Sequence, residues 1–186
     1  MNGGCVYPGL APEKKAQLTA FEDGIIQMQL QMERSFTKIA SSTGKPSVVI
    51  FDRGLMDIPA YLPREAWLEL LETLGFTEEY FAGRYDIVLH LVTTAHGVED
   101  VYEVQKSNNA ARSETAQQAR ELCDKVLDCW SIHPNVVKLE NTADGFASKL
   151  ASGTSAVLEM IDAKKVWLRR KAAQETAAEG ANKHAK

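Results

Sequence analysis

Four residues that follow an apolar run are of types suited to metal and phosphate chemistry. Asp52, Arg53, Gly54 and Asp57 come after SVVIF at residues 47–51. A carboxylate can hold Mg²⁺ directly or through water, the planar guanidinium of arginine matches phosphate oxygens, and glycine allows a tight turn beside a ligand. Structural alternatives stay open, because Asp52 can cap the next helix and Arg53 can form an ion pair with Asp52 or Asp57.

The elements that would position these side chains alternate along the chain. Short apolar runs predict strands at residues 47–51, 86–93 and about 135–140, with helical segments between them. This alternation predicts parallel βαβ units and hence an α/β sandwich. Three strands are few for this length, since a mean sheet has about five or six.

Apolar spacing also predicts the buried faces of the helices. In the long helix from Pro12 to about Ser42, the predicted stripe consists of Leu18, Phe21, Ile25, Met28, Met32, Phe36 and Ile39. The helix that begins near Pro63 is expected to bury Trp67, Leu70, Leu71 and Leu74 and to end at Gly75. For the helix that begins near Thr115, Ser113 and Thr115 are candidate N-caps and Leu122, Val126, Leu127 and Trp130 form the expected inner face.

Composition bounds the compartment and the partners. A net charge of −4 gives no general reason to expect a nucleic-acid partner. Three cysteines without CxxC spacing predict reduced thiols, and no run of 18 apolar residues occurs, so we expect a cytoplasmic protein without a transmembrane segment. Residues 1–160 are predicted to form the domain, and residues 161–186 a basic, partly disordered tail.

The ordered set DRGLMD, RYDIVLHL, NNAARSE and HPNVVKLEN carries a family resemblance. The chain resembles the AAA-type P-loop ATPase domain shared with NadR-like ribosylnicotinamide kinases and the TRPL translocation defect protein family, from roughly residue 3 to residue 158. The resemblance implies a three-layer P-loop NTPase-like sandwich around a parallel sheet. It also implies that ATP or GTP binds with Mg²⁺ and that a small molecule or water accepts a phosphoryl group.

One part of the family pattern is missing from these 186 residues. No GxxxxGK[ST] loop occurs, and in the nearest segment, TGKPS at residues 43–47, proline takes the Ser/Thr position. That loop supplies the backbone N–H groups and the lysine that hold the β- and γ-phosphates. We therefore expect a truncated or degenerate member that lacks its first, central strand and binds nucleotide weakly or not at all.

The resemblance assigns expected roles to individual residues. Asp52 resembles a Walker-B aspartate that holds Mg²⁺, and Arg53 resembles the arginine that contacts acceptor-side phosphate or hydroxyl groups. Gly54 and Asp57 are expected beside the substrate. For Asp57, contact with substrate and contact with Arg53 are equally open.

Two further segments complete the expected site. Arg112, in SNNAARSET, is expected in a lid that closes over the transferring phosphate, with Arg120 assisting from the next helix. Asn141 and Thr142 follow the last strand, where related folds approach the nucleotide base. A surface ion pair is the alternative for each arginine, and a turn after a strand is the alternative for Asn141.

Two other kinds of function remain open from the sequence. The first is a non-enzymatic nucleotide- or lipid-linked trafficking module, in which the basic segment at the end of the chain would contact phospholipid. The second is a gene-model fragment that does not fold stably alone. ATP or GTP specificity, the phosphoryl acceptor and the oligomeric state leave no trace in the sequence.

Overall fold

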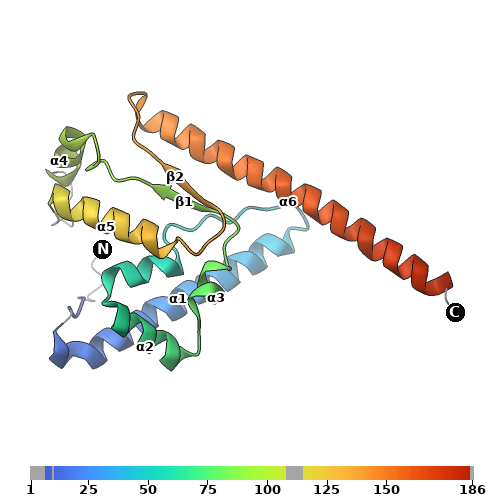
Figure 1. Ribbon diagram of the computed structural model, residues 1–186, viewed down its shortest axis with the longest axis horizontal. Coiled ribbons are helices and arrows are strands. Elements are labelled where there is room, and N and C mark those ends of the chain that lie inside the picture. Colours follow the sequence, from blue (N-terminus) through green and yellow to red (C-terminus); the bar gives the residue numbers. More distant parts are fainter. Residues whose placement is uncertain (1–6, 10, 108–114, 185–186) are drawn as a thin grey trace. The chain divides into compact units, whose positions relative to one another are not determined.

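The computed structural model describes residues 7–9, 11–107 and 115–184, and the side chains among these other than those of residues 104–107, 172 and 176–184. It is a helix-rich α/β structure with a two-stranded parallel sheet (Figure 1). The elements in chain order are η1 (Pro12–Lys14), α1 (Lys15–Ser42), η2 (Leu55–Tyr61), α2 (Arg64–Leu74), α3 (Glu78–Ala82), β1 (Val88–Leu91), α4 (Glu99–Ser107), α5 (Ala116–Cys129), β2 (Val136–Leu139) and α6 (Gly145–His184).

The chain divides into two compact units, which are described separately. The first unit comprises Met1–Arg84 and Leu122–Pro134, and the second comprises Tyr85–Glu121 and Asn135–Lys186. The first unit therefore holds α1, α2, α3 and the later part of α5. The second holds both strands, α4 and α6.

Residues 46–51 form no strand, so the prediction of a strand at residues 47–51 is wrong. They are drawn as a coil that follows α1 in Figure 1, and the side chain of Ile50 is 83% exposed. A strand requires a neighbour that pairs with its N–H and C=O groups. Within the described part of the chain, the sheet consists of β1 and β2 alone.

The other two predicted strands are confirmed as β1 and β2. They run parallel, with Val88 opposite Val136 and Leu91 opposite Leu139. The ladder continues past the strands through the bond from the Val92 N–H to the Leu139 carbonyl, at 3.0 Å. The predicted parallel βαβ connection is therefore present, whereas the three-layer sandwich stays a prediction.

Helix α1 buries a different face from the one predicted. Its buried residues are Leu18, Glu22, Ile26, Leu30 and Glu33. Of the predicted stripe, Leu18 is buried, whereas Ile25, Met28, Met32, Phe36 and Ile39 are exposed. The helix has apolar residues on two sides, and packing selects the side that carries Ile26 and Leu30. Glu33 on that side forms an ion pair with Arg84. The Arg84 guanidinium also donates a hydrogen bond to the Tyr80 hydroxyl oxygen at 2.9 Å.

Helices α2 and α3 form the compact part of the first unit. Trp67, Leu70 and Leu71 are buried as predicted, and Gly75 ends α2 with a φ of 71°, the left-handed conformation that favours glycine. Arg64 and Trp67 both bind the Glu78 carboxylate, the indole N–H at 2.8 Å. Arg64 is the main reason that the pKa of Glu78 lies below its usual value. This clamp fixes α3 against α2.

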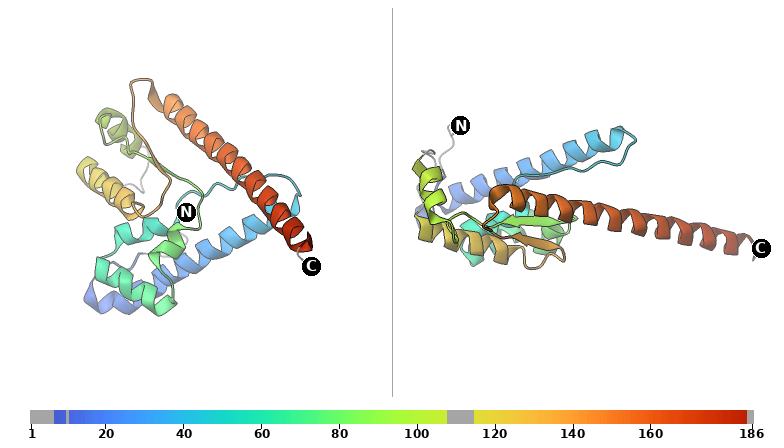
Figure 2. Two further views of the ribbon diagram at one scale, coloured as in Figure 1. Left: turned by 45° about the vertical axis from the view of Figure 1, so that its right-hand side comes forward. Right: turned by 90° about the horizontal axis from the view of Figure 1, so that it is seen from above.

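In the second unit, α6 packs on the strand pair through a glycine. A side chain at Gly153 would lie 3.1 Å from Leu139 and 3.6 Å from Leu89, which explains the small residue in mid-helix. Helix α6 continues without interruption across residues 160 and 161, and Figure 2 shows it as one continuous helix in both views. Residues 161–184 of the expected tail therefore extend the same helix, and the division at residue 160 stays a prediction.

Capping on α5 agrees with the sequence. The Thr115 hydroxyl accepts a bond from the Gln118 N–H at 3.2 Å, and the Gln118 side chain accepts one from the Thr115 N–H at 2.9 Å. This reciprocal arrangement satisfies two donors at the start of the helix. Val126 and Trp130 are buried on the predicted inner face, and Leu122 and Leu127 are partly buried.

Candidate functional site

The Asp52–Arg53–Gly54 turn lies in the first unit, between the coil of residues 46–51 and η2. Arg53 has a φ of 77°, and it is the non-glycine residue with positive φ among those described. Such a conformation costs free energy for a residue with a Cβ, and it persists where the surroundings hold it. The Gln29 amide donates to the Arg53 carbonyl at 3.4 Å, so α1 contributes to holding the turn.

Asp57 anchors this turn to the core. One carboxylate oxygen accepts a bond from the Trp130 indole N–H at 2.6 Å, in a buried position. The other oxygen lies 3.5 Å from Nη1 of Arg53. The Asp57 N–H also donates to the Gly54 carbonyl at 3.0 Å, which closes the turn locally. Asp57 therefore positions Arg53, and the alternative of an Arg53–Asp57 ion pair describes the observed contact.

Asp52 differs from Asp57 in its surroundings. Its side chain is exposed, and within the described part of the chain no hydrogen bond or ion pair reaches its carboxylate. Asp52 does not cap a helix either, because η2 begins at Leu55 with Gly54 at the cap position. The carboxylate is thus open to a cation from solvent, next to the exposed guanidinium of Arg53.

In the second unit, Asn141 joins the ends of the two strands. Its amide donates to the carbonyls of Thr93 and His96, both at 2.8 Å, and its carbonyl oxygen accepts from Lys149. The Asn141 side chain is therefore committed to holding the loop after β1. Thr142 is exposed, and its carbonyl accepts the Gly145 N–H at the start of α6.

Lys149 is a residue that the sequence reasoning missed. It is buried on α6 and donates to the Val92 carbonyl at 2.8 Å as well as to Asn141. Buried lysines are rare, and this one lies at the carboxyl ends of parallel strands, where α/β folds place ligands. The sequence offered no signal for this role, because a lysine on a helix is expected to be exposed.

The two lid arginines have different outcomes. Arg120 donates to the Ala95 carbonyl at 2.8 Å and lies 3.4 Å from Glu99, so it ties α5 to the loop after β1. Backbone N–H groups of Glu99 and Gly97, assisted by Arg120, hold the pKa of the Glu99 carboxyl below its usual value. Arg112 lies outside the described residues, and its role stays a prediction.

The predicted site residues therefore fall into two groups. Asp52, Arg53, Gly54 and Asp57 lie together in the first unit, whereas Arg120, Asn141 and Thr142 belong to the second. The structure brings Arg53 and Asp57 into contact, and it reveals Trp130 and Lys149 as the buried partners of Asp57 and Asn141.

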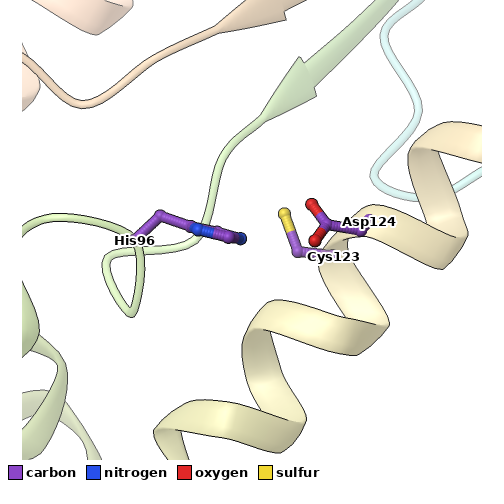
Figure 3. A group of neighbouring side chains, drawn as sticks. All are labelled: His96, Cys123 and Asp124. Carbon is purple, nitrogen blue, oxygen red and sulfur yellow. The ribbon is translucent and has the colours of Figure 1, made fainter.

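The cysteines of α5 carry free thiols. Figure 3 shows Cys123 and Asp124 on α5 and His96 on the loop that follows β1. Cysteine, aspartate and histidine are metal ligands in principle. His96 belongs to the second unit and the other two to the first, so among the described residues neither unit by itself holds three such ligands close together. Burial, followed by the charges of Glu78, Asp128 and Asp57, raises the pKa of Cys129 to about 11. This thiol is therefore a poor nucleophile at neutral pH.

The comparison with protein families decides the relationship. A family model described as an AAA domain matches residues 6–146, which is most of the chain. The chain belongs to the AAA domain family. Membership indicates a P-loop NTPase-like fold and nucleotide binding of the ATPase or kinase type. No curated protein and no solved structure matched this AAA domain.

The match extends into both units, ends at residue 146 near the start of α6, and includes all of the site residues predicted from the sequence. Within the described residues of this AAA domain, no helix has both the length and the apolar character that crossing a membrane requires.

Proposed function

We propose that this AAA domain is a kinase- or ATPase-type nucleotide-binding domain in which Asp52 holds Mg²⁺ and Arg53 contacts phosphate. The observation that carries the proposal is the turn at Asp52–Arg53–Gly54. Arg53 adopts a left-handed conformation there and is held by Asp57 and Gln29. Backbone conformations of this kind concentrate at functional sites.

The residues of the turn fit a magnesium–nucleotide complex. Mg²⁺ keeps several waters and is usually held by one or two carboxylates together with substrate phosphates. Asp52 offers one exposed carboxylate that no side chain or backbone group binds in the described part of the chain. When bound, the ion would neutralise charge on the phosphates. The exposed guanidinium of Arg53 would orient a phosphate oxygen through its planar fork.

We further propose that the chain belongs to the NadR-like branch and that these 186 residues bind nucleotide weakly. The first part rests on the DRGLMD and HPNVVKLEN segments, and the second on the lack of a GxxxxGK[ST] sequence within the 186 residues. Without the N–H groups and lysine of such a loop, much of the usual phosphate affinity is missing. ATP, GTP and a small-molecule acceptor remain the proposed ligands.

Titration calorimetry with ATP and with GTP, each with and without Mg²⁺, tests the proposal. We expect dissociation constants of roughly a millimolar, with a Mg²⁺-dependent part that Asp52→Asn removes. Asp128→Asn, on the exposed side of α5, is the matched control and should bind as the wild type does. Micromolar affinity would refute weak binding, and binding that is insensitive to Asp52 would refute the proposed metal site.

A second candidate function is attachment to an anionic phospholipid surface, which one feature of α6 favours. Val166, Trp167 and Leu168 are exposed and lie between two basic groups, Lys164–Lys165 and Arg169–Arg170–Lys171. Clustered lysines and arginines attract a protein segment to an anionic lipid surface, and exposed apolar side chains beside them can add contact with the lipid.

Vesicle sedimentation distinguishes this second candidate. Binding to phosphatidylserine vesicles, weaker binding to phosphatidylcholine vesicles and loss of binding in Trp167→Ala would support it. Equal amounts of protein in the supernatants of both kinds of vesicle would remove this candidate. Leu158→Ala, a change in an exposed apolar residue of α6 away from the basic groups, is the matched control and should bind as the wild type does.

A further inference from the structure

A cavity of about 180 Å³ lies between α1 and α2 in the first unit. Its walls combine apolar side chains, including Leu18, Leu62 and Leu70, with five polar ones. The polar residues are Lys15, Thr19, Glu22, Glu69 and Thr73. The volume equals that of roughly six water molecules at the density of the liquid. A small organic molecule therefore fits.

Glu22 is the unusual member of this lining. The residue is only 5% exposed, and within the described part of the chain no hydrogen bond or ion pair satisfies its carboxylate. Glutamate is almost never buried without a partner, because loss of hydration destabilises the charged form. In accord with this, burial raises the pKa of Glu22 above its usual value of 4.5.

The other polar groups leave the cavity rich in hydrogen-bond acceptors. The Thr19 hydroxyl donates to the Lys15 carbonyl at 3.0 Å, and the Thr73 hydroxyl donates to the Glu69 carbonyl at 2.8 Å. Each hydroxyl has thus used its proton and retains lone pairs.

The single cation of the lining is already balanced. Lys15 Nζ lies 2.6 Å from the Glu69 carboxylate. With that pair neutral as a whole, the charge that remains uncompensated in the lining is that of Glu22.

We propose that this cavity binds a small organic ammonium ion, with the ammonium group on the Glu22 carboxylate and a short aliphatic chain against the leucines. An ammonium has three donors and one positive charge, which complement an unpaired carboxylate among acceptors. The aliphatic part would remove apolar wall area from water, which favours the bound state. The site is separate from Asp52 and Arg53, so the proposal does not depend on nucleotide binding.

The probe is n-butylammonium, compared with 1-butanol as a neutral molecule of similar size. In an NMR titration of the full chain near neutral pH, we expect butylammonium to shift amide signals of α1 and α2 and to bind at least about tenfold more tightly than butanol. Glu22→Gln should remove that difference. Glu72→Gln, an exposed glutamate of α2 outside the cavity lining, should preserve it.

The pH dependence gives a second readout that needs no variant. The charged and titratable groups facing Glu22 are Lys15 from α1, Glu69 from α2 and Tyr7 from the segment before η1. Binding should strengthen as the pH rises through the titration of Glu22, because the ionised carboxylate is the form that attracts a cation. By linkage, saturating butylammonium should lower the pKa of Glu22 in a ¹³C-carboxyl titration.

Three results would overturn the inference. One is equal affinity for the ammonium and the alcohol, and another is unchanged ammonium binding in a folded Glu22→Gln variant. If that variant does not fold, a Glu22 pKa in the wild-type chain that butylammonium leaves unchanged has the same force.

Discussion

Replacing Trp130 by phenylalanine tests whether the contact with Asp57 stabilises the first unit. The substitution keeps an aromatic ring in a buried position and removes the indole N–H that lies 2.6 Å from the Asp57 carboxylate. A hydrogen bond to a charged group contributes about 1.5–3 kcal/mol. The other partner of the Asp57 carboxylate is Arg53, whose Nη1 lies 3.5 Å away and whose side chain is 65% exposed. This ion pair adds little stability, because exposed pairs contribute about 0–1 kcal/mol.

The expected loss in the free energy of unfolding is therefore about 2–4 kcal/mol, with a part of it due to the smaller ring. Urea denaturation followed by circular dichroism measures it without relying on tryptophan fluorescence. Trp167→Phe is the matched control, since Trp167 is exposed on α6 and its change should fall within about 0.5 kcal/mol of zero.

A double-mutant cycle with Asp57→Ala, which removes the acceptor, separates the contact from the change in volume. The two substitutions should be coupled by about 1.5–3 kcal/mol, because either one breaks the same interaction. If their effects add to within about 0.5 kcal/mol, the indole–carboxylate bond does not hold the turn, and the reasoning that assigns Asp57 a positioning role fails.

Three further predictions concern other parts of the chain. Cys129 should react with iodoacetamide near pH 8 about 100-fold more slowly than a thiol of pKa 9.0, because its own pKa is about 11. Peptide mass spectrometry measures the rate, and a rate equal to that of the thiol of pKa 9.0 would contradict the prediction. Gly24→Ala on α1 should raise the free energy of unfolding by up to about 1 kcal/mol, because the added Cβ meets open space. Gly153→Ala on α6 should raise it less, because the added Cβ would lie 3.1 Å from Leu139. Equal increases in the two variants, measured by thermal unfolding, would contradict the packing at Gly153. Burial raises the pKa of Glu22, so its contribution to stability is present below about pH 4.5 and is lost as the pH rises through the raised value. The stability of Glu22→Gln relative to wild type should therefore increase from acid to neutral pH in urea titrations, and a constant difference would argue against the buried carboxyl.

Local sequence patterns predicted the elements that depend on local interactions. The stripe of Trp67, Leu70 and Leu71, the left-handed Gly75 and the Thr115 cap each depend on residues within about one helical turn. The two strands were predicted as well, because short runs rich in Val, Ile and Leu, such as those at residues 86–93 and 135–140, are typical of parallel strands.

Patterns failed where a partner elsewhere in the chain decides the outcome. Helix α1 has two apolar sides, and its tertiary neighbours select the side with Ile26 and Leu30. Residues 47–51 have the composition of a strand, but composition supplies no partner for their backbone.

The candidate site shows the same division. Arg53 and Asp57 are four residues apart, so their ion pair was among the alternatives that the sequence offered. Trp130 lies 73 residues from Asp57 and Lys149 lies 57 residues from Val92. No local pattern indicates contacts at such separations, because they exist only after the chain has folded.

The lack of backbone hydrogen bonds at residues 48–51 has a consequence for amide hydrogen exchange with solvent. Within the described part of the chain, the N–H groups of these residues have no hydrogen-bond partner, although a 28-residue helix precedes them. Deuterium should enter them almost as fast as it enters an unstructured peptide, while the ladder of Val88–Leu91 with Val136–Leu139 keeps its protons far longer. Residues 48–51, which precede Asp52, would then be deuterated within the first seconds, so their exchange rate can report binding near Asp52. Any ligand or partner that supplies the missing backbone acceptors would be detected there as slowed exchange.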